Sequence, residues 1–164
     1  MLTGLTEIVE AMPQFQQLVG DLRANSKGSA SVLQSAQPLL VGALWREMRV
    51  PVLVVTPRPE DARRMHDRLL TYFGEDAAIY SFAELEALPF ERLTADTATM
   101  HQRLGALAAL AGIYPDAPPP LVVTSAVGVA LKTLSLQRFH SDQGHHVLRR
   151  GERVSMEGLL ERWM

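Results

Sequence analysis

Apolar residues recur along the chain at two different spacings, and the alternation between them predicts an α/β fold. Residues 5–22 place apolar side chains at helical spacing, and Pro13 divides them into a short helix and a longer one. Beyond residue 28, short apolar runs that are typical of buried strands alternate with helical stretches. These runs are Val32–Leu33, Pro51–Val55, Ala77–Tyr80 and Leu121–Val123. The alternation predicts a parallel sheet flanked by helices.

Capping residues predict where the intervening helices begin and end. Pro59, which suits a first helical turn, opens a helix that Gly74 closes. Asp96 caps a second long helix that ends at Gly112, and Ser125 caps the helix after the last strand. The expected buried stripes of the two long helices are Ala62, Met65, Leu69 and Phe73 in the first, and Met100, Leu104, Leu107 and Leu110 in the second.

The character of the chain changes near residue 144. Residues 145–154 alternate like a hairpin or an edge strand, and Ser155 caps a helix that reaches Met164 without a stop signal. We therefore expect a helical lead-in over residues 1–25, an α/β domain over 26–143 and the start of a small second α+β subdomain over 144–164. The missing stop signal suggests a piece of a longer protein.

The segment between the first expected strand and its helix has the layout of a phosphate-binding loop without its chemistry. Such a loop needs a lysine for the phosphates and a hydroxyl for Mg²⁺. Here the sequence is Ser35-Ala36-Gln37-Pro38, so an uncharged amide and a proline stand at those two places. Pro38 suits the first turn of a helix but has neither a hydroxyl nor an N–H. We predict a P-loop/RecA-like topology with a degenerate phosphate loop and no bound cofactor.

Composition narrows the possibilities further. The 164 residues are 47% apolar and 21% charged, which fits a globular domain. A net charge of −2 gives no general attraction to nucleic acid or to anionic membranes, and the absence of cysteine excludes disulfides and thiolate chemistry. No apolar run approaches the about 18 residues of a membrane span, and no signal peptide is visible. We expect a cytoplasmic protein.

An ordered series of short motifs runs from residue 88 to the end of the chain. Its members are Leu88-Pro89-Phe90-Glu91-Arg92, Asp96, Arg103-Leu104, Val122-Val123-Thr124-Ser125, Arg150-Gly151-Glu152 and Leu159-Leu160-Glu161-Arg162. In this order and at these spacings, the series resembles the amino-terminal region of bacterial transcription-repair coupling factors. The resemblance covers residues 24–164, and the motif at 88–92 is its most specific part.

That region is similar to the excision-repair protein UvrB, so the resemblance implies a UvrB-like fold. UvrB keeps its phosphate loop and carries an aromatic hairpin that wedges into DNA, whereas this chain has only Phe82, Pro89 and Phe90 between Tyr80 and Asp96. The resemblance therefore implies a non-enzymatic module that supports recruitment of a UvrA-type repair protein, chiefly through the remainder of the second subdomain. It also implies contacts with other domains of the same chain. RNA polymerase and DNA would be engaged only by other parts of a parent that is an ATP-dependent DNA translocase.

Several residues have both a functional and a structural interpretation. Arg149, Arg150, Glu152 and Arg153 are candidate partner-binding residues, although a solvated strand and turn accounts for them as well. In the motif at 88–92, Pro89 would fix a loop, Phe90 would anchor it and Arg92 would tie it down, with Arg103 in the helix that follows. These are structural roles rather than catalytic ones.

Residues that suggest enzymatic or metal chemistry have simpler explanations. His145 and His146 are adjacent and would point to opposite faces of a strand, so they cannot chelate together. Ser125 lacks a visible general base and is explained as a helix cap, next to Thr124 at the end of the same strand. Glu84, Glu86 and Glu91 lie in a polar loop without metal-ligand spacing.

Two other classes of function stay open. A nucleotide-binding enzyme with a non-standard loop would hold phosphate through backbone N–H groups between Gln34 and Leu39. A DNA-binding module would use the basic stripe of Arg63, Arg64 and Arg68. Glu60 and Asp67 stand at helical spacing to pair with Arg64 and its neighbours, which favours a solvated face over a DNA-binding one.

Overall fold

The computed structural model describes residues 3–85, 96–140, 148 and 150–163, and the chain forms two compact units, Met1–Leu131 and Lys132–Met164. The first unit contains α1 (Thr3–Glu10), α2 (Pro13–Asn25), α3 (Gln37–Met48), β1 (Val52–Thr56), α4 (Pro59–Phe73), β2 (Ile79–Phe82), α5 (Thr97–Leu110), β3 (Leu121–Ser125) and α6 (Ala126–Ala130). The second contains α7 (Leu136–Phe139) and α8 (Met156–Trp163). The predicted division at residues 25/26 and 143/144 stays a prediction.

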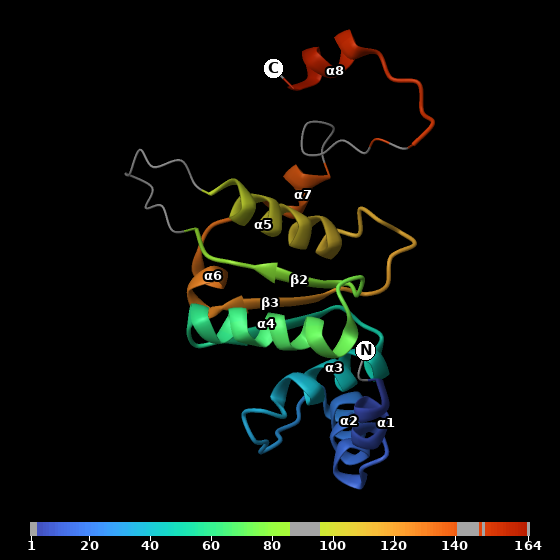
Figure 1. Ribbon diagram of the computed structural model, residues 1–164, viewed down its shortest axis with the longest axis vertical. Helices are drawn as coiled ribbons and strands as arrows, with labels where there is room; N and C mark the ends of the chain where they lie inside the picture. Colours follow the sequence, from blue (N-terminus) through green and yellow to red (C-terminus); the bar gives the residue numbers. More distant parts are fainter. Residues whose placement is uncertain (1–2, 86–95, 141–147, 149, 164) are drawn as a thin grey trace. The chain divides into compact units, whose positions relative to one another are not determined.

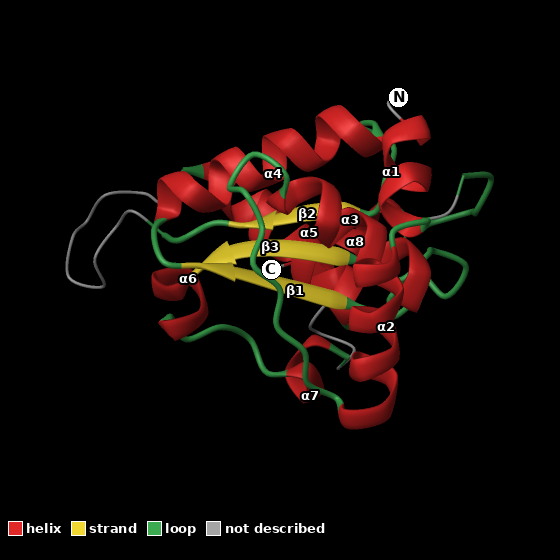
Figure 2. Cartoon of the chain, turned by 90° about the horizontal axis from the view of Figure 1, so that it is seen from below, coloured by secondary structure: helices red, strands yellow, loops and turns green. Residues whose placement is uncertain are grey.

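The strands form a parallel sheet in the order β1-β3-β2, which Figure 2 shows with the strands side by side. Leu121 of β3 stands in register with Val52 of β1 on one side and with Ile79 of β2 on the other. Each strand lies within two residues of a run expected from the sequence. The predicted α/β class with a parallel sheet flanked by helices is therefore confirmed.

Helices cover both faces of this sheet (Figure 1). On one face, Leu69 and Phe73 of α4 pack with Ile79, Leu121 and Val123. On the other face, α5 brings Ala106 against Phe82 and Val122. Alternate residues of β3 thus supply both clusters, as expected for a central strand of a parallel sheet.

Most of the predicted helix boundaries are confirmed by their caps. Asp96 accepts hydrogen bonds from the backbone N–H groups of Ala98 and Thr99, and Ser125 Oγ accepts one from Gly128 N at 3.0 Å. The helix after Asp96 ends at Leu110, and Gly112 follows with a φ of 67°. Pro59 opens α4, and Gly74 follows its last residue with a φ of 91°. These positive φ values favour glycine.

The expected strand at Val32–Leu33 is wrong. Residues 27–33 have no regular structure, Leu33 is 79% exposed, and its carbonyl accepts a hydrogen bond from Ala36 N in the turn that leads into α3. A two-residue apolar run carries little information, because such runs also occur in exposed connections. The sheet of the described residues therefore lacks the strand that precedes a functional phosphate loop.

The expected buried stripe of α5 is wrong at three of its four residues, while Leu107 packs against the core cluster as expected. Met100, Leu104 and Leu110 are 42–45% exposed, whereas Arg103 and Ala106 are buried. Apolar residues lie on most sides of this helix, so periodicity alone did not identify the side that meets the sheet. In α4, where charged residues define the outer side, the predicted stripe is confirmed.

The two amino-terminal helices pack against α3. Pro13 separates them as predicted, and Phe15 and Val19 of α2 are buried against Ala43. Arg46 of α3 donates a hydrogen bond to Thr6 Oγ1 at 2.7 Å. Within the described part of the chain, no helix has the length and apolar character that crossing a membrane requires.

In the second unit, Ser155 caps α8 as predicted, accepting a hydrogen bond from Gly158 N at 3.3 Å. The predicted hairpin or edge strand over residues 145–154 lies partly outside the described residues, at 145–147 and 149. Its described residues form no strand, and a turn occurs at Arg150–Gly151, where Gly151 has a φ of 89°.

The packing between α3 and α4 yields a first prediction. A Cβ added at Gly42 would collide with the ring of Phe73, which is buried and packs edge-on against Trp45. Overpacking costs about 1–3 kcal/mol and exceeds the gain in helix propensity of about 1 kcal/mol. We expect Gly42→Ala to lower the free energy of unfolding, measured by urea denaturation.

Gly105→Ala in α5 is the matched control, because nothing lies within 4 Å of the added methyl group. It should raise the free energy of unfolding by about 0.5–1 kcal/mol. Equal effects of the two substitutions would contradict the close contact between α3 and α4.

Candidate functional site

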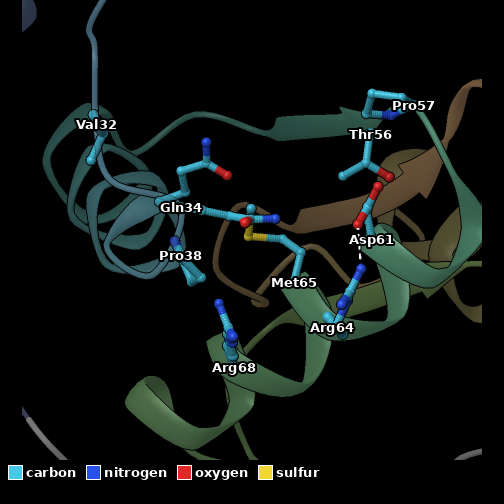
Figure 3. Close-up of a pocket in the computed structure, with 10 residues that line it drawn as sticks. Val32, Gln34, Pro38, Thr56, Pro57, Asp61, Arg64, Met65 and Arg68 are labelled. Carbon is cyan, nitrogen blue, oxygen red and sulfur yellow. Dashed lines mark hydrogen bonds and ion pairs between the residues drawn. The ribbon is translucent and has the colours of Figure 1, made fainter.

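A cavity of about 420 Å³ lies where the amino-terminal ends of α3 and α4 meet the carboxyl end of β1 (Figure 3). Its lining comes from three stretches of sequence and includes both charged and apolar side chains. The residues are Val32, Gln34, Gln37, Pro38, Thr56, Pro57, Asp61, Arg64, Met65 and Arg68. Ligands bind at this end of open parallel sheets, so the cavity is the candidate site.

Two of the four residues predicted to form a degenerate phosphate loop, Gln37 and Pro38, line one wall of the cavity. Gln37 begins α3 and lines the cavity, while Pro38 is buried in the first helical turn. Ala36 precedes the helix and offers no side-chain cap, and Ser35 lies in the exposed turn before it. None of these four residues is a cation, and Ser35, which carries the hydroxyl among them, does not line the cavity. Its helix start is preserved, because Pro38 has the φ that a first turn requires.

The positive charge of the site comes from α4 instead. Asp61 in the first turn accepts hydrogen bonds from Arg58 Nε at 3.0 Å and from Arg64 Nη2 at 2.6 Å. These two hydrogen bonds hold the pKa of Asp61 below its ordinary value. The hydrogen bond to Asp61 in turn raises the pKa of Arg58. Arg68 lies one helical turn beyond Arg64 on the same face. The expected pairing of Arg64 with Glu60 is wrong, because Asp61 takes that role.

Thr56 closes the inner end of the cavity at the last residue of β1. Its hydroxyl lies 3.0 Å from the carbonyl oxygen of Arg58 and 3.3 Å from that of Thr124. The side chain is buried, and its hydroxyl donates to these backbone carbonyls, which connects β1 to the turn that follows it. Thr56 therefore supports the wall of the cavity rather than offering a free hydroxyl.

A second polar cluster lies at the ends of β2 and β3. The Arg103 guanidinium lies 3.9 Å from the centre of the Phe82 ring and donates a hydrogen bond to the carbonyl of Ala83. Burial lowers the pKa of Arg103, and Glu84 opposes that effect. Glu84 accepts a hydrogen bond from Ser125 Oγ at 3.1 Å and lies 3.7 Å from Arg63.

This cluster gives Ser125 and Glu84 structural roles. Ser125 caps α6 and anchors Glu84, while Glu84 and Arg103 hold the start of the segment that follows β2. The sequence singled out Arg103 through its motif, but nothing in the sequence placed it against Phe82. Among the described residues, no group of three or more His, Cys, Asp or Glu side chains could hold a metal ion.

Among the described residues, none of the other candidates lines the cavity. Arg150, Glu152 and Arg153 are exposed and belong to the second unit, where Arg150 occupies a turn. Arg149 and the motif Leu88-Pro89-Phe90-Glu91-Arg92 lie outside the described residues. The basic stripe is divided, because Arg63 approaches Glu84 whereas Arg64 and Arg68 line the cavity.

Fold and site together define a parallel α/β domain in which the turn before α3 lacks the lysine and hydroxyl of a phosphate-binding motif. No family model matches the chain. Two known proteins are similar to it, the transcription-repair-coupling factors of Mycobacterium bovis and Mycobacterium tuberculosis, each 34% identical over 143 residues. The match covers 83% of this chain and 11% of each relative. The chain is thus related to transcription-repair-coupling factors over most of its own length, which confirms the resemblance.

The Arg103 cluster yields a second prediction. Arg103→Met keeps much of the volume but leaves the Ala83 carbonyl without its partner, which costs about 1–3 kcal/mol when the group is buried. We expect this loss in the free energy of unfolding from urea denaturation. Arg23→Met, which breaks the exposed 2.8 Å ion pair with Glu47, should cost less than about 1 kcal/mol. Equal costs would show that Arg103 is not an anchor.

The Asp61 pair yields a third prediction. Because the pKa of Asp61 is lowered in the folded state, the pair stabilises the fold above the ordinary carboxyl pKa, and this stabilisation is lost as the pH falls through the lowered value. Carbon-detected NMR titration should place the Asp61 midpoint below that of a model aspartate. Arg64→Gln should raise the midpoint, since it removes one of the two hydrogen bonds.

Arg68→Gln is the control for that titration, because it removes a charge from the same face without removing a hydrogen bond to Asp61. Its effect on the Asp61 midpoint should be smaller than that of Arg64→Gln. A midpoint that is unchanged in Arg64→Gln would contradict the pairing.

Proposed function

We propose that this chain is a non-catalytic, UvrB-like amino-terminal module of a transcription-repair coupling factor. In this role it supports recruitment of a UvrA-type repair protein and regulates its own parent chain during transcription-coupled DNA repair. The observation that carries the proposal is the 34% identity to two transcription-repair-coupling factors over 83% of the chain. Motor activity would belong to other parts of the parent, because the match spans only 11% of each relative.

The chemistry of the α3 start supports the non-catalytic part of the proposal. Hydrolysis of a nucleotide needs a cation on the β/γ-phosphates and a ligand for Mg²⁺. Gln37 and Pro38 supply neither, and the nearby Thr56 hydroxyl is directed at backbone carbonyls. We therefore propose that the domain acts by binding other proteins and by packing against its parent chain, and not by hydrolysing a nucleotide.

The second unit supplies the proposed partner surface. Arg150 and Arg153 are exposed and stand with Glu152 in a short stretch before α8, and Arg149 belongs to the same stretch by sequence. Exposed cations of this kind contribute chiefly to partner choice and association rate. We propose that this stretch contacts an acidic surface of the UvrA-type protein or of the parent chain.

The fourth prediction tests this proposal in the full-length coupling factor. Deleting residues 1–164 should change both its affinity for the UvrA-type protein and its basal ATPase rate, because recruitment and self-regulation would be lost together. Arg150→Glu with Arg153→Glu should weaken UvrA binding, measured by surface plasmon resonance, while leaving the fold intact by circular dichroism.

Arg23→Glu is the control for the charge reversals, because it reverses an exposed arginine in the other compact unit. Unchanged UvrA affinity and an unchanged ATPase rate after the deletion would rule the proposal out. A loss of UvrA affinity with the deletion but not with the charge reversals would move the contact away from Arg150 and Arg153.

A further inference from the structure

The cavity between α3 and α4 still has the size of a ligand site. Its volume of about 420 Å³ falls within the range of about 300–1,000 Å³ that is usual for small-molecule pockets. The phosphate loop no longer contributes a lysine or a hydroxyl, and Pro38 removes one backbone N–H from the first turn of α3. Any ligand would therefore be held by side chains rather than by the loop backbone.

Two guanidinium groups stand on one wall of this cavity. Arg64 and Arg68 are separated by one turn of α4, and the 2.6 Å hydrogen bond to Asp61 fixes the position of Arg64. A guanidinium has five N–H donors, so Arg64 retains donors after that contact. Within the described part of the chain, Arg68 makes no hydrogen bond or ion pair.

Neutral donors stand on the opposite wall. The amide side chains of Gln34 and Gln37 line the cavity from the turn before α3 and from its first residue. Figure 3 shows Gln34 on the α3 side of the cavity and Arg64, Met65 and Arg68 on the α4 side. The lining charges are two arginines against Asp61 alone, which leaves the cavity positive. A positively charged cavity with hydrogen-bond donors on both sides suits an anion.

We propose that this cavity binds the phosphate group of a small phosphorylated molecule, or inorganic phosphate itself, through Arg68, Arg64, Gln34 and Gln37. A tetrahedral phosphate presents oxygens to both walls at once, whereas a carboxylate is matched by a single guanidinium fork. No lining residue takes the place of the lost lysine or metal-binding hydroxyl, so binding does not require Mg²⁺. The inference is independent of the proposed repair function.

The fifth prediction is a titration of the 164-residue chain with inorganic phosphate, followed by heteronuclear NMR at constant ionic strength. We expect saturable shifts of the Arg68 side-chain N–H and of the Gln34 and Gln37 amides, equal with and without Mg²⁺. Acetate at the same concentration should give weaker shifts. Arg68→Gln should weaken phosphate binding at least about tenfold, because a hydrogen bond to a charged group is lost.

Arg63→Gln is the matched control, since it removes the same charge from the same helix at a residue that approaches Glu84 and does not line the cavity. It should leave phosphate affinity within twofold of the parent chain. The proposal is overturned if phosphate causes no saturable shifts, if acetate binds equally well, or if the two substitutions weaken binding equally. If a short single-stranded oligonucleotide binds more tightly than phosphate, and Arg68→Gln and Arg63→Gln weaken that binding equally, the arginines form a DNA-binding stripe and the phosphate proposal is wrong.

Discussion

Strand β3 is hydrogen-bonded along both of its edges and buried on both of its faces. The neighbouring strands and helices provide the hydrogen bonds and the packing that this position requires. All five of its residues are buried, so each backbone group must find its partner within the protein. β1 and β2 supply those partners, while α4 and α5 cover the two faces. The buried hydroxyl of Thr124, near the end of β3, also has a partner within the protein, because it donates a hydrogen bond to the carbonyl oxygen of Phe82 at 2.8 Å.

The position of the candidate site follows from this central strand. β3 holds β1 in register up to the pair Thr56 and Ser125, and α4 begins three residues after β1 ends. The start of α4 is thereby fixed beside the start of α3, and the cavity lies between them. At the neighbouring strand end, Ser125 and Arg103 hold the first residues of the segment after β2. The cavity thus lies at the strand end where ligands bind in parallel α/β sheets, beside a turn without the lysine and hydroxyl of a phosphate-binding loop.

Sequence patterns predicted helix boundaries and buried faces correctly where neighbouring residues allowed only one arrangement. The helix caps at Asp96 and Ser125 were predictable because a carboxylate or hydroxyl before a helix has a specific backbone partner. The buried side of α4 was predictable because its charged residues define the outer face. Helix α5 and the segment at Val32–Leu33 were not, since an apolar residue does not indicate which neighbour it meets.

The candidate site was only half predictable from the sequence. The absence of a lysine and a hydroxyl at Gln37 and Pro38 is visible in the sequence. That Arg64 and Arg68 line the same cavity as Gln37 and Pro38 depends on the tertiary structure, whereas helical spacing alone suggested an exposed stripe that also included Arg63. The pairing of Asp61 with both Arg58 and Arg64 likewise depends on side-chain directions that spacing leaves open.

The α3 start forms one wall of a cavity and lacks the lysine and hydroxyl that nucleotide phosphates and Mg²⁺ require. Isothermal titration calorimetry of ATP and ADP with Mg²⁺, on the natural sequence and on a Gln37→Lys, Pro38→Thr double variant, tests this account most directly. The account predicts no Mg²⁺-dependent nucleotide binding by the natural sequence. Micromolar binding of ATP by the natural sequence that disappears when Mg²⁺ is omitted would contradict it and would favour a nucleotide-binding enzyme with a non-standard loop.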